Sequence, residues 1–217
     1  MTDYKTYFAG DDALSYVMDV GSAATRNLFL PHLVGRVLEV GPGMNRISER
    51  SDAMDIADGI SIESTPFEDG SYETIMMSHV LEHVRSDMLA IAECYRLLTP
   101  GGRLVVLSPG GRLCTREETL RNGHVRRYDR DRVQFLETPL FPCVHFRYVH
   151  RAHDLIWNRL KFVLKALNYP LRRIDGRSIY ERKWYAWMRP RLTRLLDRLD
   201  RDAKRGNAFF IMEKIEV

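Results

Sequence analysis

Apolar and polar positions along the first half of the chain predict short strands separated by helices. Over residues 11–30 the apolar residues recur at roughly helical spacing, which predicts one or two N-terminal helices. Residues 35–41 are β-formers that end in glycine, typical of a buried strand leading into a turn. Residues 74–80 form an almost unbroken apolar run, typical of a strand buried on both faces.

A helix and a further strand follow. Ser86 is a good N-cap, and the apolar residues after it lie on one helical face until the Pro-Gly-Gly sequence at 100–102 ends the helix. Residues 103–108 then predict a strand, and the short connection after the first strand has room only for a helix near Asn45 to Arg50. This order implies parallel strands with helical crossovers, in which ligands bind at the carboxyl ends of the strands.

The second half has a less regular pattern. Residues 144–148 predict a strand, 151–168 and 184–204 predict helices, and 207–215 predict a last strand. The fold class that follows is α/β. With 217 residues and 45% hydrophobic content, the chain can build one good-sized core.

Composition narrows the classes of protein. No signal segment is recognisable, and no apolar stretch approaches the roughly 18–20 residues that cross a bilayer, so we expect a cytoplasmic protein. Cys94, Cys114 and Cys143 are scattered, which argues against a disulfide framework or a zinc site. The net charge of +4 is unevenly distributed, with about −8 in residues 1–110 and about +12 in residues 111–217.

The sequence Glu39-Val-Gly-Pro-Gly43 is the first candidate for ligand binding. Glycines lack the Cβ atoms that keep a ligand away from the backbone, but such turns also occur in many loops that bind nothing. A nicotinamide dinucleotide site would want a third glycine at the position of Arg46, which weakens the dehydrogenase alternative.

Four segments together resemble the class I S-adenosylmethionine-dependent methyltransferases, in the type 11-like group, in both order and spacing. They are residues 37–43, 66–73, 79–84 and 97–104, with a looser echo at 123–128. The resemblance implies a Rossmann-like sheet with helices on both faces. A C-terminal helical, aromatic and basic insertion would precede the last strand. It also implies S-adenosyl-L-methionine as the cofactor and methyl transfer as the reaction.

We expect a single methyltransferase domain over residues 1–217. Within it, residues of about 35–110 would form the cofactor-binding core and about 111–205 the acceptor-recognition region. Residues 207–217 would form the final strand.

The resemblance also implies cofactor contacts for individual residues. Gly41 and Gly43 would pass under the methionine part, and Glu39 would help to hold its ammonium group. Asp55, at the end of the second strand, would accept the ribose hydroxyls, since one carboxylate can take two charge-assisted hydrogen bonds. The fallback candidates for this role are Asp52 and Asp58.

The predicted adenine contact departs from the family. Ser61 stands where an adenine-contacting aspartate is frequent, so we expect the Ile62 backbone and Glu63 to provide this contact. Ser78 and His79, at the tip of the strand over residues 74–80, complete the predicted cofactor-binding set.

Histidines are the candidate catalytic groups. A hydroxyl acceptor must lose its proton to a base within about 3 Å, and His79 and His124 are equally good candidates. His79 and His83 have a spacing that suits a metal on a helix, but the strand-to-helix transition splits that face, so we predict no metal ligand and a structural role for His83. The group formed by His145, His150, His153 and Asp154 matches no compact ligand set.

Residues 180–205 combine aromatic side chains with many arginines. Aromatic faces can stack on sugars or lie at a membrane interface, and arginines can bind phosphates. Alternatively, this segment is an ordinary helix with a buried apolar face, because four leucines, Leu192, Leu195, Leu196 and Leu199, follow helical spacing. Interleaved aspartates disfavour nucleic acid.

We therefore predict O-methylation of a sugar or glycan hydroxyl, with a small-molecule or glycan acceptor. The alternatives are a methyltransferase for a quinone, a lipid or another small molecule, a non-catalytic cofactor-binding subunit, and a polyamine synthase with a related sulfonium donor. Peripheral membrane contact and a homodimer stay open.

Overall fold

The computed structural model describes residues 20–43, 46–110, 123–150, 152, 155–156, 158–200, 203–204 and 206–216. The chain divides into two compact units. The smaller unit comprises Met1–Leu28 and His150–Asp202, and the larger comprises Phe29–Val149 and Ala203–Val217. The single domain expected over residues 1–217 stays a prediction.

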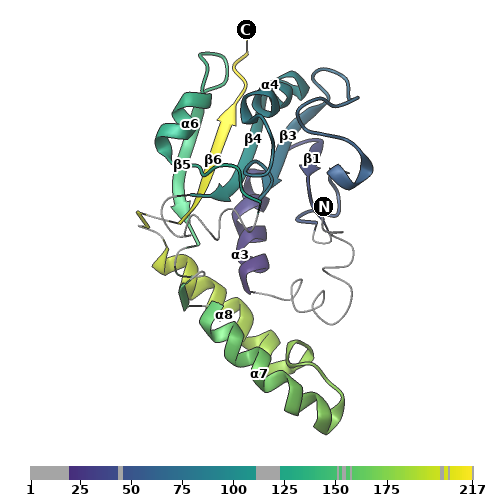
Figure 1. The fold of residues 1–217 in the computed structure, drawn as a ribbon, viewed down its shortest axis with the longest axis vertical. Coiled ribbons are helices and arrows are strands. Elements are labelled where there is room, and N and C mark those ends of the chain that lie inside the picture. Colours follow the sequence, from purple (N-terminus) through teal and green to yellow (C-terminus); the bar gives the residue numbers. More distant parts are fainter. Residues whose placement is uncertain are drawn as a thin grey trace. The chain divides into compact units, whose positions relative to one another are not determined.

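The larger unit contains a six-stranded sheet in the order β2-β1-β3-β4-β6-β5 (Figure 1). Its strands are β1 (Val37–Val40), β2 (Asp52–Met54), β3 (Tyr72–Ser78), β4 (Leu98–Pro109), β5 (Cys143–Val149) and β6 (Asn207–Glu213). The strands β1 to β4 pair in parallel, whereas β6 runs antiparallel to both of its neighbours. The α/β fold class with a Rossmann-like sheet is therefore confirmed.

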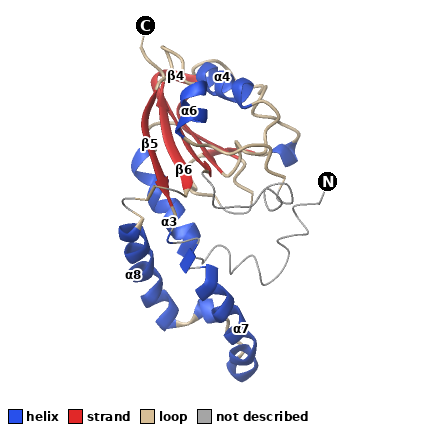
Figure 2. Cartoon of the chain, turned by 60° about the vertical axis from the view of Figure 1, so that its left-hand side comes forward, coloured by secondary structure: helices blue, strands red, loops and turns tan. Residues whose placement is uncertain are grey.

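Alternate residues of the strands supply the main core, because successive side chains of a strand point to opposite faces. On one face, apolar side chains of β1, β3, β4 and β6 pack with α4 (Asp87–Leu97) and α6 (Arg130–Leu136), which Figures 1 and 2 show beside the sheet. On the other face, Phe29, the last residue of α3 (Val20–Phe29), meets Phe209 edge-on at 5.9 Å between ring centroids. Each large buried side chain contributes roughly 1.5–3 kcal/mol.

The strongest local signals in the sequence predict their elements correctly. Ser86 caps α4 by accepting a 3.3 Å hydrogen bond from the Leu89 N–H. The apolar run over residues 74–80 becomes β3, which ends at Ser78. β4 begins at Leu98, before the predicted stop at 100–102, because Leu98 already pairs with Tyr72 and an irregularity in the pairing accommodates the turn.

The short helix expected near Asn45 to Arg50 is a wrong prediction as far as the structure describes this segment. Residues 46–50 form bends and turns, and Asn45 lies outside the described residues. The physical reason is Glu39, whose buried carboxylate accepts hydrogen bonds from the Ile47 and Ser48 N–H groups. The backbone follows this carboxylate instead of a helical pattern.

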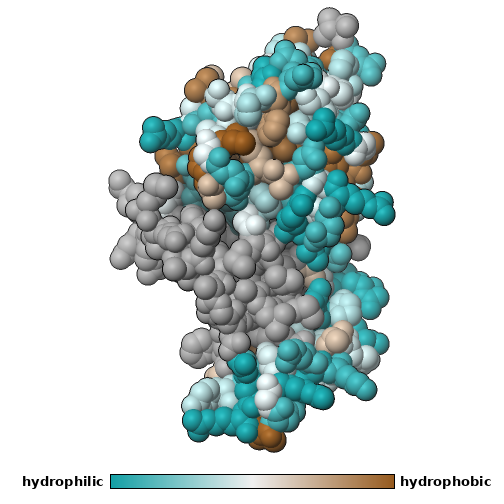
Figure 3. Space-filling view, turned by 90° about the vertical axis from the view of Figure 1, so that its right-hand side faces the viewer, coloured by the Kyte–Doolittle hydropathy of each residue, from teal (hydrophilic) through white to brown (hydrophobic). Residues whose placement is uncertain are grey.

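The smaller unit contains two long helices, α7 (Asn158–Asp175) and α8 (Lys183–Leu199), with the short helix η4 (Ile179–Glu181) between them. α7 and α8 lie side by side in Figures 1 and 2, and hydrophilic residues dominate the face of this hairpin drawn in Figure 3. Among the described residues of this unit, Ala152, Leu164, Ile179, Tyr185 and Leu196 form a buried cluster. The two predicted helices are confirmed with shifted boundaries.

The leucine face expected on α8 is only partly buried. Leu196 is buried and Leu192 packs beside it, but Leu195 and Leu199 are exposed, as are Trp184 and Trp187. Tyr185, which is not part of the leucine pattern, is buried in the same cluster as Leu196. Of the helices expected over residues 11–30, the structure describes α3 from Val20 to Phe29, and residues 11–19 lie outside the described residues.

Cys94 and Cys143 are free thiols, and Cys114 lies outside the described residues. Among the helices that the structure describes, none combines the length and the apolar character needed to cross a membrane.

Glu93 on α4 holds the loop that precedes β3 against the helix. Its Oε1 atom accepts hydrogen bonds of 2.8 Å from both the N–H and the hydroxyl of Thr65. Arg96 bonds the same carboxylate and the Phe67 carbonyl. The hydrogen bond from Arg96 is the main cause that lowers the pKa of Glu93 to about 2.

Glu93→Gln should lower the free energy of unfolding at pH 7 by roughly 1–2 kcal/mol, because the charge-assisted hydrogen bonds are lost. The folded pKa lies below the ordinary 4.5, so this contribution is present above that pH and disappears as the pH falls toward 2. Urea unfolding at pH 7 and at about pH 3.5 measures it. Glu68→Gln, at an exposed position of the same loop, should change little, and a Glu93→Gln effect that is independent of pH would contradict the assignment.

Candidate active site

Three predicted site residues follow the carboxyl ends of neighbouring parallel strands. Gly41 comes after β1, Asp55 after β2 and His79 after β3. Carboxyl ends of parallel strands meet at one edge of a sheet, where α/β proteins bind their ligands. The structure therefore brings these residues to one edge, as the sequence predicted.

The two glycines of the loop after β1 are needed for different reasons. Both have positive φ, 63° at Gly41 and 53° at Gly43, which side chains disfavour. A Cβ atom at Gly41 would lie 2.5 Å from Val80 Cγ2, so glycine there lets the loop pack against the segment after β3. A Cβ atom at Gly43 would meet nothing within 4 Å, so the backbone there is open to approach.

Asp55 ties the ends of β1 and β2 together. Its Oδ2 atom accepts a 3.1 Å hydrogen bond from the Gly43 N–H, and its Oδ1 atom accepts one of 3.0 Å from the Ala57 N–H. The second bond caps the short helix η2 (Ile56–Asp58). Each carboxylate oxygen has a second acceptor position, so a fixed Asp55 can also receive hydroxyl donors.

The two fallback candidates lie less favourably. Asp52 starts β2, at the other end of that strand, and forms a 2.8 Å ion pair with Arg36. Asp58 is exposed at the end of η2. Of the three carboxylates, Asp55 is thus the best placed to bind a ligand at the carboxyl ends of the strands.

Glu39 is 3% exposed and bonded to its own chain. Oε1 accepts a 2.7 Å hydrogen bond from the Ile47 N–H, and Oε2 accepts a 3.0 Å hydrogen bond from the Ser51 hydroxyl. The described contacts make Glu39 a positioning residue for the loop after β1. Its contact with the methionine ammonium group stays a prediction.

The predicted adenine segment is also fixed from within. Ile62 is buried, and Ser61 pairs with Ser64 in a tight bridge. Glu63 accepts hydrogen bonds from the Ser86 N–H, at the start of α4, and from the Ser61 hydroxyl. The adenine contact itself stays a prediction.

His79 has an unusual backbone and a buried carboxylate behind it. His79 follows the half-buried Ser78. The backbone φ of His79 is 58°, a conformation that histidine rarely adopts. Its Nδ1 atom lies 3.2 Å from Oε1 of Glu82, which is fully buried, and the Ser108 hydroxyl donates a 2.6 Å hydrogen bond to Oε2. Sparsely populated backbone conformations are typical of functional sites.

Glu82 stays ionised in this environment. Burial acts to raise its pKa, but the hydrogen bond and charge of His79, with the Ser108 hydroxyl, lower the pKa below its ordinary value overall. An ionised carboxylate only accepts hydrogen bonds, so Nδ1 of His79 carries the proton of this pair. Glu82 is a site residue that the sequence did not reveal, although an acidic residue directly after the apolar Val80 and Leu81 was an available signal.

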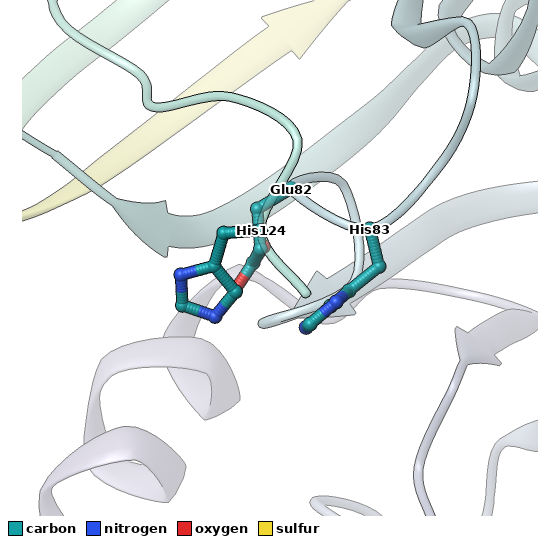
Figure 4. A group of neighbouring side chains, drawn as sticks. All are labelled: Glu82, His83 and His124. Atoms are coloured by element: carbon teal, nitrogen blue, oxygen red, sulfur yellow. The ribbon is translucent and has the colours of Figure 1, made fainter. Parts of the chain in front are cut away.

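His124 comes from a distant loop and lies next to the same group. Its ring centroid is 4.9 Å from that of His83, and Figure 4 shows both rings close to Glu82. The Val125 N–H donates a 2.8 Å hydrogen bond to the Glu82 carbonyl. Burial is the main cause that lowers the pKa of His124, with His83, His79 and Arg127 acting in the same direction and Glu82 against it.

A buried aspartate holds the loop of His124 in place. Asp87, the first residue of α4, is 2% exposed and accepts hydrogen bonds from Nε and Nη2 of Arg132 and from the Tyr128 hydroxyl. Arg126 donates a 2.7 Å hydrogen bond to the Val84 carbonyl. These bonds explain why residues 123–128 lie against the segment after β3.

Two other histidines of the larger unit lie together around Phe209. His145 on β5 and His32 lie beside Phe209, with ring centroids 5.9 Å and 5.6 Å away. His150 belongs to the smaller unit, and His153 and Asp154 lie outside the described residues.

Comparisons with known proteins agree with this geometry. The family model of the methyltransferase domain matches residues 38–106. A stretch of 64 residues is 41% identical to an uncharacterized 37.1 kDa protein in transposon TN4556 of Streptomyces fradiae. This match covers 30% of the chain and only 18% of that protein's length.

Solved structures with the same fold have low sequence identity to this chain. Phosphoethanolamine N-methyltransferase 2 of Haemonchus contortus, in complex with S-adenosyl-L-methionine, has a TM-score of 0.53 at 11% identity, over 100% of this chain and 61% of its own. The YcgJ protein of Bacillus subtilis has a TM-score of 0.51 at 14% identity, over 91% and 100%. The cyclase SpnF reaches 0.51 at 15% identity, over 90% and 81%.

Such identities show likeness of fold, and the match over residues 38–106 adds the sequence motifs at the carboxyl edge of the sheet. Residues 38–106 therefore match the methyltransferase domain family, and the chain has the fold of solved S-adenosylmethionine-dependent methyltransferases.

Proposed function

We propose that this chain transfers the methyl group of S-adenosylmethionine to a hydroxyl oxygen of a sugar or glycan. The observation that carries the choice of oxygen is the pair formed by His79 and the buried Glu82 at the carboxyl edge. A hydroxyl is a weak nucleophile until a base takes its proton, and a histidine oriented by a carboxylate is suited to that task.

The reaction is a single displacement at carbon. The acceptor oxygen attacks the methyl carbon in line with the C–S bond, whose electron pair stays on sulfur, and the products are a methyl ether and S-adenosylhomocysteine. Nε2 of His79 takes the hydroxyl proton. Glu82 accepts from Nδ1 and stabilises the imidazolium that forms, and it is therefore a positioning residue. Most of the acceleration comes from holding the two reactants in line.

Cofactor binding is proposed for the residues that surround the loop after β1. The open backbone at Gly43 leaves room for the methionine part, and Asp55 has acceptor positions for the ribose hydroxyls. The Glu39 carboxylate has acceptor positions that the loop does not use, and these would bind the ammonium group. Ile62 and Glu63 would line the adenine. Ser78 would lie beside the sulfonium.

The acceptor class rests on the helices α7 and α8. Trp184 and Trp187 are exposed, and the Arg191 guanidinium stacks on the Trp187 ring at 4.0 Å. Exposed aromatic faces next to arginines suit rings that carry hydroxyls or phosphates. This supports a sugar or glycan over a flat apolar acceptor.

Asp55→Ala should weaken S-adenosylmethionine binding by about tenfold to a hundredfold, because charge-assisted hydrogen bonds of roughly 1.5–3 kcal/mol are lost. Isothermal titration calorimetry measures the dissociation constant. Asp58→Ala removes a nearby exposed carboxylate and should bind normally. An Asp55→Ala protein that is folded and binds as tightly as the wild type would exclude the ribose role.

His79→Asn should lower turnover by roughly 10²–10⁴ with little change in cofactor affinity, because the base is removed. Asparagine tolerates positive φ, so this variant keeps the backbone conformation better than alanine would. His124→Ala is the parallel test of the other candidate. Full activity in His79→Asn and loss in His124→Ala would transfer the base role to His124, and full activity in both would remove it from both.

A methyl-transfer screen with labelled S-adenosylmethionine tests the acceptor class. Saccharides should be methylated at oxygen, and the label should survive in an ether. Labelling of quinones or lipids with no saccharide touched would overturn the glycan assignment and keep the methyltransferase. If no acceptor is labelled and calorimetry detects no S-adenosylmethionine binding, the proposed function fails.

A further inference from the structure

Three potential metal ligands converge beside the candidate base. Glu82 and His83 belong to the segment between β3 and α4, and His124 comes from the loop before α6. One ligand atom from each side chain lies within 4.8 Å of the other two. Figure 4 shows the three side chains gathered in one place. The spacing of His79 and His83 considered in the sequence analysis could not reveal this set, because the third member lies 41 positions further along.

Two of the three residues, Glu82 and His83, have hydrogen-bond partners that are typical of metal ligands. The Ser108 hydroxyl donates to Glu82 Oε2, and Nδ1 of His83 lies 3.3 Å from the Gly123 carbonyl. A carbonyl only accepts, so this hydrogen bond places the proton on Nδ1 and the lone pair of His83 on Nε2. Such outer hydrogen bonds orient carboxylate and histidine ligands in metal sites.

We propose that Glu82, His83 and His124 form a binding site for a divalent transition metal ion, with zinc as the best-suited ion. Two histidines and a glutamate are a donor set of catalytic zinc sites, which keep a further position open for water or substrate. At metal–ligand distances of about 2.0–2.2 Å, two ligands of one ion lie about 3–4 Å apart. The ligand atoms lie up to 4.8 Å apart, so the exposed His83 and half-buried His124 rings would have to move closer together to bind one ion.

The backbone around the triad is held without any ion. Val125 N–H bonds the Glu82 carbonyl at 2.8 Å, and the Asp87 carboxylate binds Arg132 and Tyr128 on the following segment. Both loops are thus joined on either side of the ligands. A metal would only have to reorient side chains, which favours binding, because little backbone order remains to be gained.

A role for the ion follows if the proposed function holds. The site adjoins His79, which contacts Glu82 through Nδ1. A metal at the triad would bind the acceptor hydroxyl as a Lewis acid and ease the loss of its proton to the base. The proton balance is unchanged, since the hydroxyl proton still goes to His79 and the methyl group to the acceptor oxygen.

The binding test uses the full-length chain without a histidine tag, treated with EDTA and then dialysed. Zinc titration by calorimetry should show one equivalent bound with a dissociation constant in the micromolar range or tighter. Cobalt should give visible absorption bands of a low-coordinate site. His83→Ala and His124→Ala should each weaken zinc binding by at least about a hundredfold, whereas His145→Ala, on β5 of the same unit, should not.

Circular dichroism melts show whether each variant is folded. The His83 and His124 side chains are not part of the core, so we expect both variants to fold. No zinc binding by the wild type, or binding that survives both histidine variants, overturns the site. Equal loss in His145→Ala also overturns it.

The metal site and the methyltransferase assignment can fail independently. S-adenosylmethionine binding is measured by calorimetry in EDTA, where no ion is present. A chain that binds the cofactor and methylates an acceptor in EDTA, yet binds no zinc, keeps the proposed function and loses the metal site. A chain that binds zinc at the triad without S-adenosylmethionine keeps the site and loses the role in methyl transfer.

Discussion

The buried carboxylate of Glu82 organises the carboxyl edge of the sheet. An ionised group without solvent is costly unless it is paired and hydrogen-bonded, so its neighbours must supply donors. Ser108 at the end of β4 bonds one oxygen, and His79 after β3 contacts the other. The backbone carbonyl of the same residue accepts from Val125. One residue therefore fixes the candidate base, the end of a central strand and the loop that carries His124.

The same principle builds the cofactor side of the edge. Glu39 and Asp55 each accept hydrogen bonds from the backbone N–H groups of a neighbouring loop, at Ile47 and at Gly43. Loops carry backbone donors that need partners, and a fixed carboxylate is a strong one. The three acidic residues thus shape the loops after β1, β2 and β3 before any ligand is present.

The sequence predicted well what depends on local patterns. Alternating and helical apolar spacing, with the Ser86 cap, gave β1, β3 and α4, and the parallel order placed Gly41, Asp55 and His79 at one edge. It failed where a distant group decides. The helix expected near residues 45–50 is absent from the described 46–50 because Glu39 takes their N–H groups. The approach of His124 to His83 depends on Asp87 and Arg132, which are 45 positions apart, and no local pattern encodes such a contact.

The central claim is that the carboxyl edge binds the methyl donor with its sulfur facing His79. A crystal structure with S-adenosylhomocysteine tests it most directly. We predict that the ribose hydroxyls lie within hydrogen-bond distance of Asp55, that the methionine part follows the backbone at Gly43, and that the sulfur faces the His79 imidazole across the space for an acceptor. A ligand bound away from this edge, or bound there with its sulfur turned away from His79, would contradict the account.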